Sequence, residues 1–280
     1  MAYTLYNYTP SLAAAVIFII LFFTLTLGHI FLAFKHKLKF LIAFIVGGLF
    51  ESIGYAARAV SAHSAPDYAT MPYALQSLFI LLGPSLFAAS IYMILGRIIR
   101  MTDGDSRSMV RGSRLTKIFV AGDVLSFLIQ SGGGAIMSSA KTASKLKLGE
   151  IVIIVGLIVQ IIFFGFFVSI SIAFHKRMSG YPTSAAMAAS FNWDHYMKVL
   201  YFASVMIMVR CLYRVIEYIQ GSTGFLQSHE YFAYIFDATL MLCVMAIFIV
   251  FHPSQIFTGQ HKELDETELI YGHQGYRQQV

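Results

Sequence analysis

The clearest pattern along the chain is a series of long apolar stretches separated by short polar connections. A helix needs about 20 mostly apolar residues to cross a hydrocarbon core of roughly 30 Å. Seven stretches are long enough, at residues 11–34, 40–60, 75–99, 115–138, 149–174, 196–219 and 231–251. The pattern predicts an all-α membrane protein, a seven-transmembrane-helix bundle over residues 11–257 that follows a short extracellular N-terminus at 1–10.

The composition agrees with a lipid environment. Of the 280 residues, 58% are hydrophobic and 12% are charged, whereas a soluble domain carries about 25% charged residues. The connections are too short for a soluble domain, and the polar segment 258–280 is expected to be a disordered cytoplasmic tail. Cys211 and Cys243 lie in apolar stretches, so neither a disulfide nor a metal cluster is expected of them.

Lysine and arginine are distributed unevenly between alternate connections, and cytoplasmic loops normally hold the excess. The loops that follow the second, fourth and sixth stretches carry only Lys141, Lys145 and Lys147. The other side carries Lys35, Lys37, Lys39, Arg97, Arg100, Arg107, Arg111, Arg114, Lys117, Lys176, Arg177, Lys198, Lys262 and Arg277. The N-terminus is therefore predicted outside and the C-terminus in the cytoplasm, and Asn7, in the sequon Asn-Tyr-Thr, is a candidate glycosylation site.

Ionisable side chains interrupt the apolar stretches, although each costs about 2.5–3.5 kcal/mol at the centre of a membrane helix. Three trios follow the i, i+4, i+7 spacing of a single helix face, and Asp123 and Gln130 form an i, i+7 pair. The resulting polar stripes predict a cavity that opens outward and binds the substrate. Its candidate residues are Glu51, Tyr55, Arg58, Gln76, Asp123, Gln130, Arg210, Arg214, Glu217, Glu230, Tyr234 and Asp237.

The charges in this set do not balance. Five carboxyl groups face three guanidinium groups, so two acids must be protonated, solvated or matched by a positive ligand. A cationic amine or a proton would match them. Asp123 has no basic residue within one turn of its own helix, which makes it the candidate for proton coupling.

A purely structural role remains open for these side chains, because polar groups also join membrane helices to one another. Glycines, including the Gly132–Gly134 triplet, are read mainly as sites of close helix packing. Pro84, in the middle of the third stretch, should leave a main-chain carbonyl free to bond elsewhere. The tyrosines near predicted span ends, including Tyr6, Tyr8 and Tyr73, are read as interfacial anchors.

A series of motifs, in order along the chain, resembles the fungal lipid-translocating exporter family over about residues 10–253. The family includes 7-aminocholesterol-resistance proteins and a sphingoid long-chain base exporter. The motifs are Glu51-Ser-Ile-Gly-Tyr-Ala-Ala-Arg58, Gly83-Pro84, Ala88-Ala-Ser-Ile-Tyr92, Phe119-Val-Ala-Gly-Asp123, Gln130-Ser-Gly-Gly-Gly134, Arg210-Cys-Leu-Tyr-Arg214-Val-Ile-Glu217, Glu230 with Tyr234 and Asp237, and His252-Pro253.

The resemblance implies a transporter or flippase that moves amphipathic lipids, such as a sphingoid long-chain base or an aminosterol, and confers resistance to toxic lipids. We expect a plasma-membrane location, membrane lipids as partners, no nucleic-acid partner and no enzymatic activity. A receptor-like, lipid-sensing protein is the alternative, since seven spans with an outside N-terminus also suit one.

The number and the positions of the histidines bear on whether the protein is a metal enzyme or binds haem. Catalytic zinc needs about three converging protein ligands, and only His29 and His252 lie at the spans. An intramembrane lipid hydrolase is therefore disfavoured, and neither a metal nor another cofactor is expected. His29 and His252 are weak candidates for haem ligands, which the porphyrin-linked member of the resembling family makes worth testing.

Overall fold

The structure is a computed structural model that describes residues 6, 8–140, 142–189, 191–221 and 224–254. The candidate glycosylation site Asn7 and the predicted tail at 258–280 lie outside the described residues. Within them the chain is helical and has no strand. The elements are α1 (Leu12–Lys35), η1 (Lys39–Leu41), α2 (Ile42–His63), α3 (Thr70–Met101), α4 (Gly112–Ser138), α5 (Ala143–Gly180), α6 (Ser184–Ala188), α7 (Trp193–Gln220), α8 (Glu230–Ala233), η2 (Tyr234–Thr239) and α9 (Leu240–Val250).

Seven helical segments of the described chain are long and apolar enough to cross a membrane, which confirms the predicted bundle. They are α1, η1 with α2, α3, α4, α5, α7, and α8 through α9. Each matches one of the apolar stretches to within one residue or extends beyond it: α5 begins at Ala143 and ends at Gly180. The protein is therefore an integral membrane protein.

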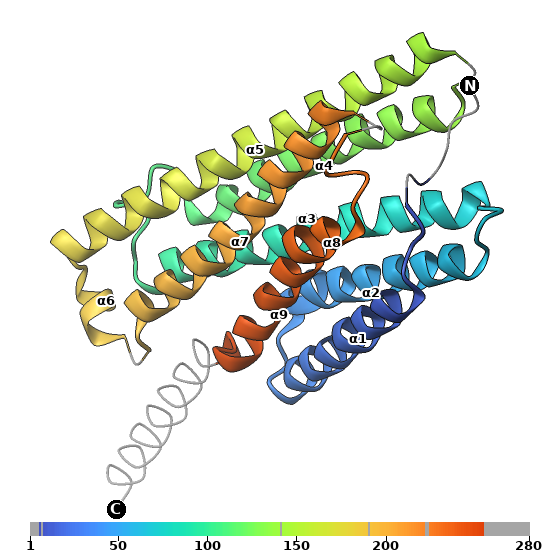
Figure 1. The fold of residues 1–280 in the computed structure, drawn as a ribbon. Helices are drawn as coiled ribbons and strands as arrows, with labels where there is room; N and C mark the ends of the chain where they lie inside the picture. Colours follow the sequence, from blue (N-terminus) through green and yellow to red (C-terminus); the bar gives the residue numbers. More distant parts are fainter. Residues whose placement is uncertain (1–5, 7, 141, 190, 222–223, 255–280) are drawn as a thin grey trace, which may run out of the picture.

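The spans close into a ring in which each contacts its neighbours in sequence and α9 returns to α1. The long pair α4 and α5 forms one side of the bundle and α1 with α2 the other, with α3 between them (Figure 1). Because α3 also contacts α7 across the ring, it forms the centre of the bundle. Side chains that α2, α3 and α7 direct inward can therefore meet.

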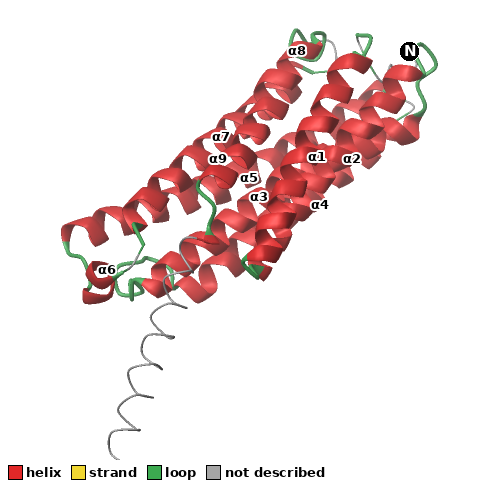
Figure 2. Ribbon diagram, turned by 90° about the horizontal axis from the view of Figure 1, so that it is seen from below, coloured by secondary structure: helices red, strands yellow, loops and turns green. Residues whose placement is uncertain are grey.

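Polar residues fix where the helices begin. The side chains of Ser11, Thr142 and Asn192 accept hydrogen bonds from the first turns of α1, α5 and α7, which satisfies N–H groups that have no partner inside the helix. The short elements α6 and α8 lie at opposite ends of the bundle (Figure 2). The end with α8 is the one predicted to face outward, and that orientation stays a prediction.

Gly133 and Gly149 allow α4 and α5 to approach until their backbones touch. A Cβ at Gly133 would lie 2.8 Å from the Gly149 carbonyl oxygen, and one at Gly149 would lie equally close to the Gly133 carbonyl oxygen. At Gly132, the residue before Gly133 on the same helix, an added Cβ would have no atom within 4 Å. The helix α4 continues through the triplet, so at Gly133 the glycine serves helix packing.

The variant Gly133→Ala is expected to lower the free energy of unfolding by about 1–3 kcal/mol, since an added methyl must push two backbones apart. Gly132→Ala is the matched control, and it should be neutral or stabilising by up to about 1 kcal/mol because alanine favours helix. Thermal unfolding of both purified variants in detergent measures the difference. Equal unfolding temperatures would show that the contact contributes nothing.

Candidate functional site

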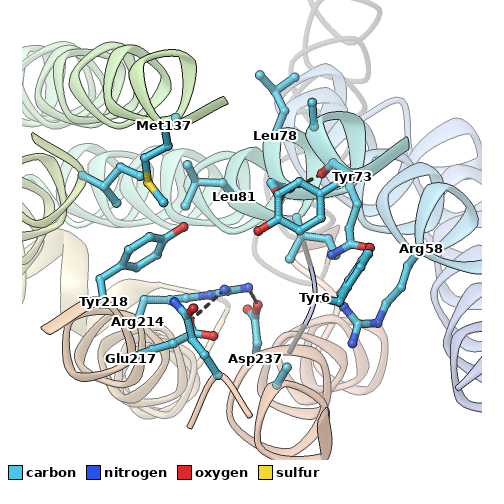
Figure 3. A pocket seen from close by; sticks show the side chains of 18 of the residues that line it. Tyr6, Arg58, Tyr73, Leu78, Leu81, Met137, Arg214, Glu217, Tyr218 and Asp237 are labelled. Carbon is cyan, nitrogen blue, oxygen red and sulfur yellow. Dashed lines mark hydrogen bonds and ion pairs between the residues drawn. The ribbon is translucent and has the colours of Figure 1, made fainter. Parts of the chain in front are cut away.

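A cavity of about 410 Å³ lies inside the bundle toward the end that is predicted to face outward. Its wall combines the N-terminal segment with α2, α3, α4, α7 and η2, and includes one residue of α5. Eight of the twelve candidate residues line it, as Figure 3 shows for several. They are Tyr55, Arg58, Gln76, Gln130, Arg214, Glu217, Tyr234 and Asp237.

Four charged side chains form a buried group at the base of the cavity, which we call the arginine cluster: Arg210, Arg214, Glu217 and Asp237. The Arg210 Nε atom donates to Asp237 Oδ1 at 2.5 Å, and the Arg214 Nη2 atom donates to Asp237 Oδ2. Arg214 Nη1 also donates to Glu217 Oε2 at 3.0 Å. Figure 3 shows Arg214 between the two carboxylates, with Leu81 and Met137 on the opposite wall.

Pro84 helps to hold Arg210 in place. A proline has no N–H group, so the carbonyl four residues earlier, that of Ile80, loses its helical partner. Arg210 Nη2 donates to this oxygen at 2.9 Å. The free carbonyl expected of Pro84 is thus found, and it joins α3 to the arginine cluster.

The mouth of the cavity is organised around Arg58, which is buried. Its Nη2 atom donates to Glu230 Oε1 at 2.9 Å and to the Tyr8 hydroxyl at 2.6 Å, and its Nε atom donates to the Tyr234 hydroxyl at 3.1 Å. Both Glu230 oxygens accept from the main-chain N–H of Ser11 at 2.9 Å. One ion pair therefore ties the N-terminal segment to α2 and α8.

Tyr6 and Tyr8 belong to this site, which the sequence did not indicate. The Tyr6 hydroxyl donates to Gln76 Oε1 at 2.7 Å, and its ring packs against Tyr68 and Tyr73. Burial raises the pKa of the Tyr8 hydroxyl above its usual range, so Tyr8 stays neutral and adds no charge beside Arg58. Tyr6, Tyr8 and Tyr73 all line the cavity, in addition to lying near the ends of spans as expected.

Gln130 connects the cavity to a chain of amides between helices. Its Nε2 atom donates to Gln160 Oε1 at 3.2 Å, and Gln160 Nε2 donates to the Ser85 hydroxyl at 3.3 Å. The Gln130 Oε1 atom is buried without a hydrogen-bond partner. This chain joins α3, α4 and α5 and leaves one acceptor unused beside the cavity.

Glu51 and Asp123, by contrast, do not line the cavity. Glu51 is 1% exposed, its Oε1 atom has no hydrogen-bond partner, and it packs against Gly83. Asp123 is 5% exposed and neither oxygen has a partner of standard hydrogen-bond geometry, although it interacts with nearby Tyr92. The two acids in excess of the arginines are thus the two that form no ion pair among the described residues.

His29 and His252 lie near the opposite end of the bundle, with ring centroids 6.3 Å apart. His29 Nε2 contacts the Met245 carbonyl oxygen at 3.0 Å and His252 Nδ1 contacts the Ser254 hydroxyl at 2.9 Å. The other nitrogen of each ring is buried without a partner. Within the described chain, no group of three or more histidine, cysteine or acidic residues could hold a metal ion.

The ion pairs also agree with a purely structural role for these charges, because they join different helices. Arg58 with Glu230 joins α2 to α8, and Arg210 with Asp237 joins α7 to η2. Both pairs link separate helical segments, as structural ion pairs do. That the same side chains also bind a ligand stays a prediction, which the arrangement around a cavity supports.

Comparison with known proteins adds the family. The RTA1-like protein family matches residues 44–260. Among curated relatives, protoporphyrin uptake protein 1 of Saccharomyces cerevisiae is 35% identical, covering 89% of this chain and 91% of the relative. Protein RTA1 of the same yeast is 34% identical over 90% and 85%, and its sphingoid long-chain base transporter RSB1 is 23% identical over 92% and 75%. No solved structure gives a significant match. The chain belongs to the RTA1-like family.

Proposed function

We propose that the protein transports amphipathic lipids with a cationic head group, of the sphingoid long-chain base or aminosterol class, across the plasma membrane. A relative named for sphingoid base transport covers most of the chain and supports the lipid class. The observation that carries the proposal is a cavity with carboxylates at its base and apolar side chains on its wall. Its volume, about 410 Å³, lies within the usual range for small-molecule sites.

The carboxylates at the base of the cavity can accept a further hydrogen bond from a ligand. Glu217 Oε2 is bound by Arg214, whereas Glu217 Oε1 has only a long contact of 3.5 Å with the Tyr213 hydroxyl. A carboxylate offers about four lone-pair sites, so the ammonium group of a lipid amine can bind Glu217 without displacing Arg214.

The apolar part of the wall suits a hydrocarbon chain. Leu78, Leu81 and Met137 line the cavity across from Arg214 and Glu217 (Figure 3), and Ile153 also lines it. Leu78, on this wall, is 38% exposed, so the wall offers accessible apolar surface to a hydrocarbon chain. We infer that the head group binds inside while the hydrocarbon chain extends toward the bilayer.

A bulky side chain introduced at Gly134 should fill the cavity. It is expected to lower sphinganine transport in reconstituted vesicles at least about tenfold, equivalent to about 1.4 kcal/mol. Gly134 lines the cavity and has nothing within 4 Å of its Cβ position, so Gly134→Trp places an indole there without a clash at Cβ. Gly132→Trp is the matched control, because Gly132 has the same free space and does not line the cavity. Equal transport by both variants, or none by the unaltered protein, would refute the proposal.

Porphyrin transport is a second candidate, favoured by the two buried histidines with unpartnered ring nitrogens at His29 and His252. A relative named for protoporphyrin uptake supports it. Imidazole nitrogens are ordinary ligands of haem iron. Titration with hemin should then give a haem spectrum in the unaltered protein that His29→Ala and His252→Ala both lose.

A further inference from the structure

Glu51 is a buried acid that stands next to a charge-balanced group. In the arginine cluster, two guanidinium groups face two carboxylates, and Arg58 is paired with Glu230. Glu51 takes part in none of the ion pairs found among the described residues. A buried carboxylate without a partner is strongly disfavoured, so Glu51 is a neutral, protonated acid in this arrangement.

The surroundings of Glu51 come from four elements. Arg210 and Arg214 of α7 and Asp237 of η2 act on its carboxyl group electrostatically, and Tyr55 lies one turn along α2. The helix α3 contributes Gly83, where a Cβ would lie 2.7 Å from Glu51 Oε1. Of these groups, Tyr55, Arg214 and Asp237 also line the cavity, so Glu51 lies directly behind the charged part of the wall.

Arg210 and Glu51 each have a buried polar atom that is free of hydrogen bonds in the part of the chain that the structure describes. The Nη1 atom of Arg210 is buried without a hydrogen-bond partner, as is Glu51 Oε1. Arg210 is also among the groups that interact with Glu51. If the arginine cluster gained one positive charge, an ionised Glu51 would balance it. Its carboxylate would then accept a hydrogen bond from the free Nη1–H group of Arg210.

We propose that Glu51 exchanges its proton for the positive charge of the lipid. This inference rests on the proposed function. When an ammonium group binds at Glu217 and Asp237, the cluster gains one positive charge. The Glu51 O–H bond then breaks, the proton leaves to water through the cavity side of the wall, and the carboxylate that remains accepts a hydrogen bond from Arg210. One cation enters and one proton leaves, so the buried charge is unchanged.

The test measures proton release when a permanently charged lipid binds. N,N,N-trimethylsphingosine cannot lose a proton itself, so any proton released on binding comes from the protein. It is titrated into purified protein in nanodiscs, in weak buffer with a pH indicator, and binding is measured in parallel. We expect about one proton released per lipid bound, and none from Glu51→Gln.

Two further variants frame the result. Asp194→Asn removes a carboxylate that is far more exposed and paired with Lys198, and it should release as many protons as the unaltered protein. Glu51→Asp keeps a carboxyl group and should retain release. If Glu51→Gln does not fold, the unaltered protein still decides, because binding without proton release overturns the proposal.

The possible failures can be told apart. Binding without proton release, or undiminished release by Glu51→Gln, contradicts proton exchange at Glu51 and leaves the lipid class standing. No saturable binding of either trimethylsphingosine or sphinganine contradicts the lipid class itself, and the exchange with it.

Discussion

Replacement of Asp237 by asparagine is expected to destabilise the protein by about 3–5 kcal/mol, the usual cost of breaking a buried ion pair on one side. Asp237 accepts from both Arg210 and Arg214, and its side chain is only 2% exposed. Asparagine removes the negative charge, so Arg210 loses its only ion pair among the described residues and Arg214 keeps only the one with Glu217. Because proteins are stable by only about 5–15 kcal/mol, much of the variant should fail to fold.

Asp194→Asn is the matched control for this variant. Asp194 also contacts two basic side chains, Lys198 at 2.7 Å and His175 at 2.8 Å, but its own side chain is 42% exposed. Exposed ion pairs contribute about 1 kcal/mol or less. Monodisperse yield and thermal unfolding in detergent measure both variants, and similar small losses in the two would contradict a stabilising role for the arginine cluster.

The variant Asp123→Asn is expected to lower lipid transport at least about tenfold, about 1.4 kcal/mol in the barrier, and to change its pH profile. If Asp123 binds and releases a proton during transport, the amide cannot replace it. Folding should be affected little, because neither carboxyl oxygen has a hydrogen bond of standard geometry to lose. A large loss of transport in a normally stable protein would identify a functional carboxyl group.

Ser126→Ala, one turn along the same helix, provides the comparison. The Ser126 hydroxyl donates to the Gly122 carbonyl oxygen of its own helix at 2.8 Å, so its removal should leave transport unchanged. Transport is measured in vesicles over a series of pH values. If Asp123→Asn keeps both the rate and the pH profile of the unaltered protein, proton coupling does not depend on Asp123.

Much of the bundle could be predicted from the sequence because a bilayer imposes simple demands. Each span must be long, apolar and helical, so the seven stretches were visible as such. Helical spacing also placed Arg210, Arg214 and Glu217 on one face of α7, where the structure has Arg214 bound to Glu217 and both arginines bound to Asp237.

Partners on other helices could not be predicted in the same way. A polar stripe of eight residues spans roughly 10 Å of helix, so its members lie at different depths in the bundle. Arg58 thus reaches the cavity mouth, whereas Glu51 on the same face is covered by α3 at Gly83. The spacing of residues along one helix does not show which neighbouring helix will cover each of them.

Two local features had no signal that periodicity could detect. The segment Tyr234–Thr239 is π-helical, whereas the spacing of Tyr234 and Asp237 was interpreted with ordinary helix geometry. Such turns often occur at functional sites. Tyr6 and Tyr8 precede the first span and resemble interfacial anchors in sequence, so their position in the cavity depends on a fold that brings the N-terminal segment to α2 and α3.

The central claim is that the cavity at the arginine cluster binds the lipid, and a structure determined with saturating sphinganine tests it most directly. The claim predicts density in the cavity, with the amine beside Glu217 and Asp237 and the hydrocarbon chain along Leu81 and Met137. An empty cavity, or lipid bound only at another place such as the pair His29 and His252, would contradict it.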